Sequence, residues 1–565
     1  MAAIVVQPFV SRFETPRVKI SNEAFENSGI EIFSSERIPF SDRTGPKIAQ
    51  NLTKMFVSRV QNLQKSSHDF HIYELGAGTG ILAKRMLDLL KTNYPNIYSQ
   101  TKLHLSDISM PALTQLKMLK DLKTHSSHIL FEVIDALNPK FSHKPLLVYF
   151  TNLIDALPHN RQILVKNGQI FEFQVQTTLK KDTQIVDATS YPPKILEGNK
   201  ITDLFSPNNI KRRIILAPQI LQSLEEKSRF VPVDEVSNMT EKERGDLKNL
   251  VKSKDNGAPF VFNYNYPARL AIIKMIRELE KGGFIFFSDF GIAEGTLEEG
   301  LHLECGLTIF FTVDFPSFKQ IAHTEGASCF LTSYLPGYPQ EMVIDTLRND
   351  LTMANLFQKA SIDYLQGEVS AFLENVKTVL SNSQMAKNQK SKRIHHLYNS
   401  LSVDVSHNYQ LLSDLPYFFL QAGFYKDADF YADILYNQYG HSVGVYYDII
   451  KGKVRQEEGN FKTAEKFFKE AAESHKGFIA YAYLAELYWQ HKRYPDYVEA
   501  IKKYLKFTRK RDHLTSLLSI ASAQEKYLGP EKAKKTLAIF ISFGKKLKNL
   551  SLSEKTSLEQ ARRLL

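Results

Sequence analysis

One short stretch, residues 70–85 with the sequence FHIYELGAGTGILAKR, constrains the fold of this chain more than any other. An apolar run ends at a glutamate and a leucine, three glycines follow at every second position, and a helical pattern begins directly after them. Glycine lets a ligand approach the main chain closely, and the first N–H groups of a helix are unpaired. The stretch therefore predicts a ligand site between a strand and a helix.

Short apolar runs alternate with helical stretches on both sides of this loop. From about residue 45 to 170, strands are expected at FHIYEL, KLHLSD, ILFEVID and LLVYF, and a further strand at GFIFFSDFG (283–291). Repeated βα units predict a parallel sheet with helices on both faces. The strands are almost continuously apolar, as expected when both faces of a sheet are covered. The predicted fold class is therefore α/β.

Two classes of cofactor use such a glycine loop. A dinucleotide fingerprint spaces its glycines G-x-G-x-x-G, and Ile81 stands where that pattern needs the last glycine. The loop instead resembles the first motif of class I S-adenosyl-L-methionine (SAM) methyltransferases, which have a Rossmann-like sheet. The resemblance implies that Gly76, Gly78 and Gly80 pass the methionine part of the cofactor and that Glu74 helps to hold its amino group.

Two further acids follow at the ends of the next two predicted strands. Asp107 ends KLHLSD, where its two oxygens can accept hydrogen bonds from both hydroxyls of a ribose. Asp135 ends FEVID, and the resemblance implies that it accepts from the adenine amino group. The alternative is that both aspartates only cap helices. The order of loop and acids favours a SAM site.

Two motifs on the far side of the predicted sheet resemble the MidA-like methyltransferases. They are the DALP element at 155–158 and the pair Asp289-Phe290-Gly291 and Val313-Asp314-Phe315. The resemblance covers about residues 30–345. The family includes a mitochondrial protein that methylates an arginine of a respiratory complex I subunit, so the resemblance implies a protein substrate with arginine as the leading acceptor. We expect Asn152 and Asp155 to face the acceptor as catalytic residues.

The chain departs from the MidA-like pattern at two acids that could hold a cationic acceptor. Asn152 stands where that family has glutamate, and Thr308 where it has aspartate. A guanidinium stays charged in water, so its site needs carboxylates; Asp155, Asp289 and Asp314 remain as candidates, with backbone capping as the alternative role. Three functions stay open: a protein methyltransferase, a small-molecule methyltransferase, and an inactive scaffold that retains the fold.

The C-terminal region repeats a pattern of a small or polar turn followed by a helix. The pattern occurs at 422–435, 458–473, 491–506 and 528–540, with corresponding residues offset by values in the low to mid thirties. A period of about 34 residues is typical of tetratricopeptide repeats, which stack into a concave surface for a protein partner. A plain helical bundle is the alternative.

These patterns divide the chain into five regions. They are an N-terminal extension (1–45), a methyltransferase domain (46–171 and 261–345), an inserted cap (172–260), a helical linker (346–400) and a tetratricopeptide-like domain (401–565).

Composition adds few constraints on partner and compartment. The net charge of +11 is mild for 565 residues, and no RNA-recognition signature accompanies it, so a nucleic-acid partner is not expected. The two cysteines and sixteen histidines show no metal-binding spacing, so no metal site is expected. No apolar run reaches the length of a membrane span. We expect a cytoplasmic protein; Arg12 and Arg17 leave a mitochondrial presequence as the alternative.

Overall fold

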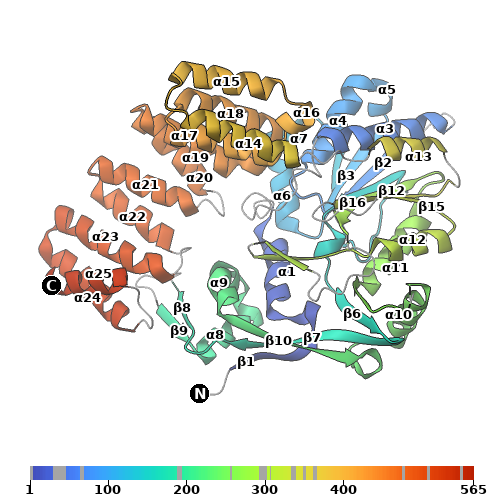
Figure 1. Cartoon of the computed structure of the whole chain (residues 1–565), viewed down its shortest axis with the longest axis horizontal. Helices are drawn as coiled ribbons and strands as arrows, with labels where there is room; N and C mark the ends of the chain where they lie inside the picture. Colours follow the sequence, from blue (N-terminus) through green and yellow to red (C-terminus); the bar gives the residue numbers. More distant parts are fainter. Residues whose placement is uncertain are drawn as a thin grey trace.

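The computed structural model describes residues 4–29, 46–63, 69–187, 194–254, 257–291, 302–305, 307–332, 339–347, 351–360, 366–473, 478–505, 510–546 and 552–564. Within these ranges the chain forms two larger β-sheets, two small hairpins and a long series of helices (Figure 1). No helix in the described ranges combines the length and the apolar character needed to cross a bilayer.

The central sheet contains the glycine-loop strand in its interior. Its strands, in spatial order, are β15 (Ser328–Leu331), β16 (Pro339–Asp345), β12 (Phe284–Phe290), β5 (Leu147–Thr151), β2 (Phe70–Leu75), β3 (Thr101–Asp107) and β4 (Ile129–Val133). Strand β16 runs antiparallel to both of its neighbours, and the ladder from β12 to β4 is parallel. After β2 the chain first adds strands on one side and then on the other, and open α/β sheets bind ligands at such a reversal.

Helices cover both faces of this sheet, as the apolar strands predicted. One face packs against α3 (Pro46–Asn62), α4 (Ile81–Asn93), α6 (Met110–Met118) and α13 (Leu351–Ala360). The other face packs against α11 (Tyr266–Glu278) and α12 (Phe315–Thr324). Neighbouring strand residues alternate between the two cores: Ile72 and Leu147 lie in the first, Tyr73 and Val148 in the second. This alternation on two covered faces explains why the strands read as continuous apolar runs.

A second, antiparallel sheet lies beside the first. It contains β1 (Val5–Ser11), β6 (Arg161–Lys166), β7 (Gln169–Leu179), β10 (Leu224–Pro232) and β11 (Phe260–Tyr264). The inserted region is therefore wider than the predicted 172–260, because its sheet also takes in β6, β11 and the N-terminal strand β1. Helix α9 (Ile210–Ser223), helix α10 (Glu241–Lys254) and the hairpin of β8 (Gln184–Asp187) and β9 (Lys194–Glu197) complete this region.

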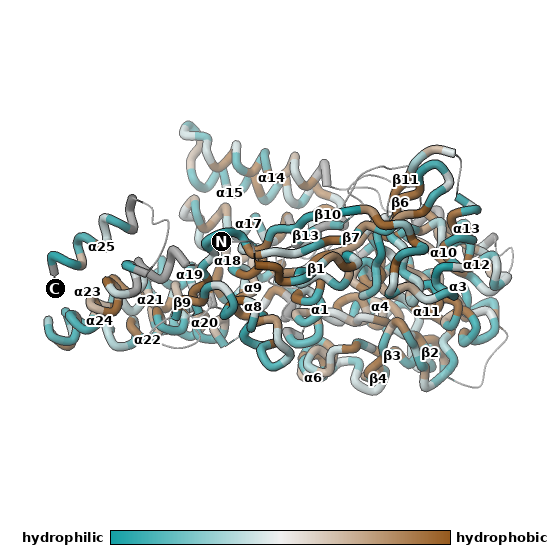
Figure 2. The backbone as a smooth tube through the Cα atoms, turned by 90° about the horizontal axis from the view of Figure 1, so that it is seen from below, coloured by the Kyte–Doolittle hydropathy of each residue, from teal (hydrophilic) through white to brown (hydrophobic). Residues whose placement is uncertain are grey.

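The C-terminal helices form a stack in which each helix from α16 onward contacts the next, and α14 contacts both α15 and α17. The described helices are α14 (Gln366–Ser381), α15 (Lys387–Asn399), α16 (Val403–Ser406), α17 (Tyr409–Gln421), α18 (Tyr425–Tyr439), α19 (Gly444–Glu457), α20 (Phe461–Glu473), α21 (Phe478–Gln490), α22 (Tyr494–Leu505), α23 (Lys510–Leu528), α24 (Pro530–Lys546) and α25 (Leu552–Leu564). Figure 2 shows α14 and α15 alternating between hydrophilic and hydrophobic residues along their length, as helices with one buried face do. We call α14 to α25 the helical array.

The array begins earlier than the sequence predicted. Residues 346–400 were expected to be a linker, but Phe372 of α14 and Ile394 of α15 are buried in the same core as Leu415 of α17. Side-chain hydrogen bonds join Lys453 to Glu486 across 33 residues and Gln456 to Gln490 across 34. These bonds recur at the predicted repeat spacing; the tetratricopeptide resemblance itself stays a prediction.

The array packs against the rest of the chain at both of its ends (Figure 1). Near its start, Ile81 of α4 lies in the core of the first array helices, and Arg85 donates to the carbonyl of Gln438 at 2.8 Å. Near its end, Val186 of β8 packs with Leu517 and Phe540. The array is therefore fixed to the region that carries the glycine loop.

Candidate functional site

The glycine loop turns sharply between β2 and α4. Gly76, Gly78 and Gly80 all have positive φ, at 65°, 53° and 70°. A Cβ on Gly76 would lie 3.0 Å from Leu153 Cδ1, and a Cβ on Gly80 would lie 3.1 Å from Leu116 Cδ2. Only glycine adopts these angles without strain, and at Gly76 and Gly80 there is also little room for a side chain. This is the physical reason for the bare sequence.

Glu74 lies at the entrance of this loop with its side chain buried. It is 5% exposed, and the hydroxyl of Tyr149 on the neighbouring strand donates to its Oε2 at 2.9 Å. Burial raises the pKa of Glu74 to about 8, because a charged carboxylate is poorly solvated there. A buried carboxyl with one neutral partner is suited to receive a cationic group.

The two predicted aspartates lie at the same edge of the sheet. Asp107 ends β3, and its Oδ1 accepts from the backbone N–H of Ser109 at 2.8 Å; burial raises its pKa. Asp135 lies two residues beyond the end of β4, is exposed, and its Oδ1 accepts from the N–H of Leu137 at 2.9 Å. Helix α6 is capped by Ser109, whose side chain accepts from the N–H of Ala112. Asp107 is therefore not the cap of that helix.

A cavity of about 190 Å³ brings most of these residues together. Its lining includes Glu74, Gly76, Gly78, Asp107 and Asp135. Of the six predicted cofactor residues, Gly80 is the one outside this lining; it is the N-cap of α4 instead. The cavity is thus bounded by the loop and by the carboxyl ends of three neighbouring strands.

Helix α1 (Pro16–Ser28) forms a wall of the cavity that the sequence did not predict. Phe25 and Glu26 line the cavity, and the ring of Phe25 meets the edge of Phe310 from β14 (Thr308–Phe311) at 6.1 Å. The helix is held by a buried ion pair, with Arg213 Nε donating to Glu23 Oε2 at 2.6 Å. No local pattern in the N-terminal residues indicates this position, because the contacts that fix it come from residues nearly two hundred positions away.

Of the two residues expected to face the acceptor, the structure places one at the cavity and buries the other. Asn152 lines the cavity, with a φ of 50°, and its N–H donates to the carbonyl of Ser288 at 2.9 Å. Asp155 is fully buried in the 3₁₀-helix Ile154–Ala156 and is not among the described residues that line the cavity. A direct contact between Asp155 and an acceptor in this cavity is therefore not available in this structure.

The other acids near the DALP element have internal partners. Asp289 Oδ2 accepts from the N–H groups of Ile154 and Asp155, at 2.9 and 3.3 Å. Asp314 Oδ1 pairs with the ammonium of Lys254 at 2.6 Å. Thr308, at the start of β14, is buried. Asp289 thus serves backbone capping, the alternative considered from the sequence, and it positions the turn that carries Asn152.

A comparison with protein-family models matches residues 51–331, just under half of the chain, to Methyltransf_28, described as "Putative S-adenosyl-L-methionine-dependent methyltransferase". No curated protein matches the chain.

Three of the solved structures that match the chain are the following. One is a Burkholderia thailandensis protein bound to S-adenosyl-homocysteine, with 15% identity and a TM-score of 0.31; the match covers 51% of this chain and 63% of that one. A second structure, described as an uncharacterized protein of the COG1565 superfamily from Burkholderia thailandensis, has 11% identity and a TM-score of 0.38; the match covers 60% of this chain and 87% of that one. The magnesium protoporphyrin IX methyltransferase of Synechocystis PCC 6803 has 9% identity and a TM-score of 0.27, over 59% and 99%. The chain thus spans 63% of the length of the first of these structures.

The family match and the cavity coincide in the chain. The family model covers the glycine loop, both aspartates and Asn152, and leaves the helical array outside. Residues 51–331 are therefore similar to putative S-adenosyl-L-methionine-dependent methyltransferases.

Proposed function

We propose that this protein transfers the methyl group of SAM to a protein substrate and that the helical array helps to hold that substrate. The observation that carries the proposal is the cavity in which the glycine loop, Glu74, Asp107 and Asp135 meet Asn152. The first four elements would seat the cofactor, and Asn152 would lie toward the acceptor. The resemblance to the MidA-like family supports this division of roles.

The chemistry of the cavity residues fits SAM. The cofactor supplies a sulfonium methyl group, which is already a good electrophile. Glu74 offers a buried carboxyl for its amino group, and Asp107 offers carboxylate oxygens for its ribose hydroxyls. The protein would then contribute mainly by orienting the acceptor and excluding water, because positioning alone can supply a large part of the rate.

The contact between the helical array and helix α4 supports a macromolecular substrate. Arg85 on the loop helix α4 bonds to Gln438, and its guanidinium lies 5.1 Å from the ring centroid of Tyr439. A surface of stacked helices beside a cofactor cavity could hold a protein while one of its side chains enters the cavity. Arginine is the first acceptor to test, on the resemblance to the MidA-like family; Asp289 and Asp314 are already engaged, so a charged acceptor would need another carboxylate.

A small-molecule acceptor is the second candidate. The edge-on contact of Phe25 with Phe310 places two aromatic rings at the cavity wall, and such rings favour a compact, partly apolar acceptor. In that case the array would serve assembly. An inactive scaffold is the third candidate, supported by the amide of Asn152 where the MidA-like pattern has an acid.

Incubation of the full chain with methyl-labelled SAM and a cell lysate tests these candidates. The proposal expects label in a protein band, and analysis of the modified residue would show whether it is arginine. The Gly78→Val variant, whose loop should not admit the cofactor, is the matched control. Label confined to small molecules would favour the second candidate, and label in neither fraction, with SAM binding intact, would favour the scaffold.

We further propose that the protein acts in the cytoplasm, on a protein and not on nucleic acid or a membrane. The mild net charge, in a chain with no recognition motif for RNA, supports this view. Fractionation of cells that express a tagged chain would test the compartment.

A further inference from the structure

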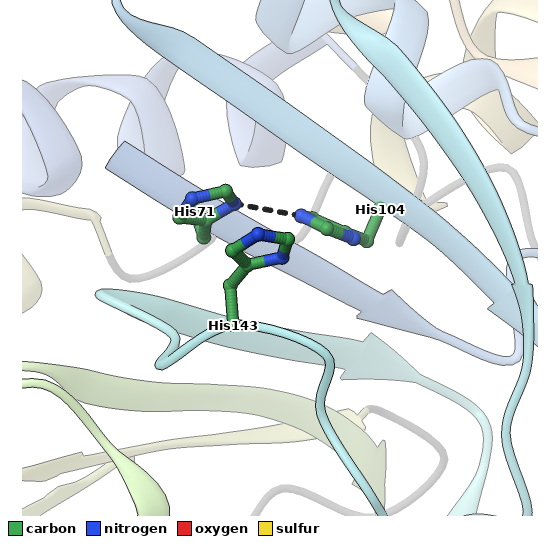
Figure 3. A group of neighbouring side chains, drawn as sticks. All are labelled: His71, His104 and His143. Carbon is green, nitrogen blue, oxygen red and sulfur yellow. Dashed lines mark hydrogen bonds between the residues drawn. The ribbon is translucent and has the colours of Figure 1, made fainter. Parts of the chain in front are cut away.

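Three histidines that are distant in the sequence meet beside the central sheet, away from the ends of its strands that carry the glycine loop. They are His71 in β2, His104 in β3 and His143 in the loop before β5 (Figure 3). One ring nitrogen from each lies within 4.8 Å of the others. His71 Nδ1 and His104 Nε2 are 2.8 Å apart, and the rings of His71 and His143 stack at 4.1 Å. We call these residues the histidine cluster.

A carboxylate orients the central member of the cluster. His104 Nδ1 lies 2.6 Å from Glu132 Oε1, so it carries the proton and donates to the carboxylate. The Nε2 of His104 then carries the lone pair and accepts a hydrogen bond from His71 Nδ1, a bond that a metal ion would replace once the His71 proton lies on Nε2. Ser142 also donates to Glu132 Oε1, at 2.7 Å. A histidine that donates one ring N–H to a carboxylate and binds the ion through its other nitrogen is the usual arrangement around protein-bound zinc.

The cluster lies partly inside the protein and partly at its surface. His104 is buried and His143 is exposed, so the cluster has a protected interior ligand and an open side through which an ion can enter.

We propose that His71, His104 and His143 bind one divalent transition-metal ion, with Glu132 as the carboxylate that orients His104. Three imidazoles without a thiolate suit zinc, with water as the fourth ligand. Zinc–nitrogen bonds of about 2.0–2.1 Å in a tetrahedron separate the ligand atoms by roughly 3.4 Å. The observed nitrogen distances, from 2.8 to at most 4.8 Å, bracket that value, so small ring rotations complete the site.

The site is separate from the methyl-transfer cavity. His71 is the second residue of β2, whereas the loop begins after Leu75 at the opposite end of the strand. Four residues of strand span about 13 Å. The ion would join two neighbouring strands to the loop that leads into β5, and its role would be structural or regulatory. The sequence predicted no metal site because 33 residues separate even the two strand histidines.

Zinc titration of the full-length chain, after treatment with a chelator, tests the proposal. The wild type should bind one equivalent of Zn²⁺ by calorimetry, and Co²⁺ in its place should give the visible absorption bands of a tetrahedral site. His143→Ala should weaken binding at least tenfold, and this exposed side chain can be removed with little effect on folding. Glu132→Gln should weaken binding by about tenfold, since it removes the carboxylate that orients His104.

His396→Ala is the matched control, because His396 is an exposed histidine in α15, outside the cluster. It should bind zinc as the wild type does. SAM binding should persist in His143→Ala, which would show that the variant is folded. Zinc binding that is equal in the wild type and His143→Ala, or that is lost equally in His396→Ala, would overturn the proposal and leave adventitious surface binding.

Discussion

The carboxyl group of Glu74 should make SAM binding depend on pH. It is 5% exposed, and burial raises its pKa to about 8. Near pH 7 the chain without cofactor therefore holds this group mainly protonated. A cationic amino group beside it would favour the carboxylate, so binding should release a proton.

The size of the effect follows from the ionised fraction. With a pKa of about 8, Glu74 is about 1% ionised at pH 6 and about 9% ionised at pH 7. If SAM binds only the ionised form, its apparent Kd scales inversely with that fraction. The Kd should therefore fall about ninefold between pH 6 and pH 7, which corresponds to about 1.3 kcal/mol.

Calorimetric titration of SAM between these two pH values measures this change. The range lies below the ordinary pKa of an α-amino group, about 7.7–8.0, so the ligand stays cationic. Glu74→Gln keeps an acceptor for the Tyr149 hydroxyl but cannot ionise, and it should bind more weakly with a Kd independent of pH. Asp107→Asn should weaken binding and retain the pH dependence. A wild-type Kd that does not change with pH, or the same slope in Glu74→Gln, would refute the reasoning.

Glu74 should also affect stability in the absence of cofactor. Between pH 4.5, the ordinary pKa of a glutamate side chain, and pH of about 8, the folded chain keeps a proton that the unfolded chain has lost. The free energy of unfolding should therefore fall as pH rises through this range, by up to about 5 kcal/mol. Thermal denaturation of Glu74→Gln should show a smaller loss between pH 5 and pH 8 than the wild type.

Three further predictions concern the loop, the acceptor side and the array. Gly78→Val should abolish SAM binding while circular dichroism stays native, because a β-branched side chain is strained at a φ of 53°; undiminished affinity would contradict the placement of the site. Asn152→Gly, which tolerates the φ of 50°, should keep SAM affinity and lower methyl transfer at least tenfold in the labelled-lysate assay; unchanged transfer would remove Asn152 from the mechanism. Arg85→Ala should speed the proteolytic release of the helical array, because it removes the hydrogen bond to Gln438. The control is Lys84→Ala, which loses an ion pair within α4. Equal rates of release in the two variants would refute the role of Arg85 in holding the array.

Features that depend on neighbours in the sequence could be predicted. The glycine loop, the strand before it and the helix after it are local, and Asp107 was expected at the strand end where it lies. The alternation of Ile72 and Tyr73 between two cores follows from the two-residue period of a strand. Asp155 was expected to face the acceptor, but in the same turn Asn152 lines the cavity and Asp155 is buried. Sequence spacing does not decide which of two polar residues in a turn reaches a cavity.

The sequence alone determined the α/β pattern, the bare loop and the acids that follow it, because backbone angles and side-chain periodicity act over a few residues. Only the tertiary structure decided that α1 walls the cavity, that α14 and α15 belong to the array, and that His71, His104 and His143 meet. These arrangements depend on contacts between segments far apart in the chain, such as Arg213 with Glu23. A local pattern leaves such pairings open, since many partners could bury the same apolar face.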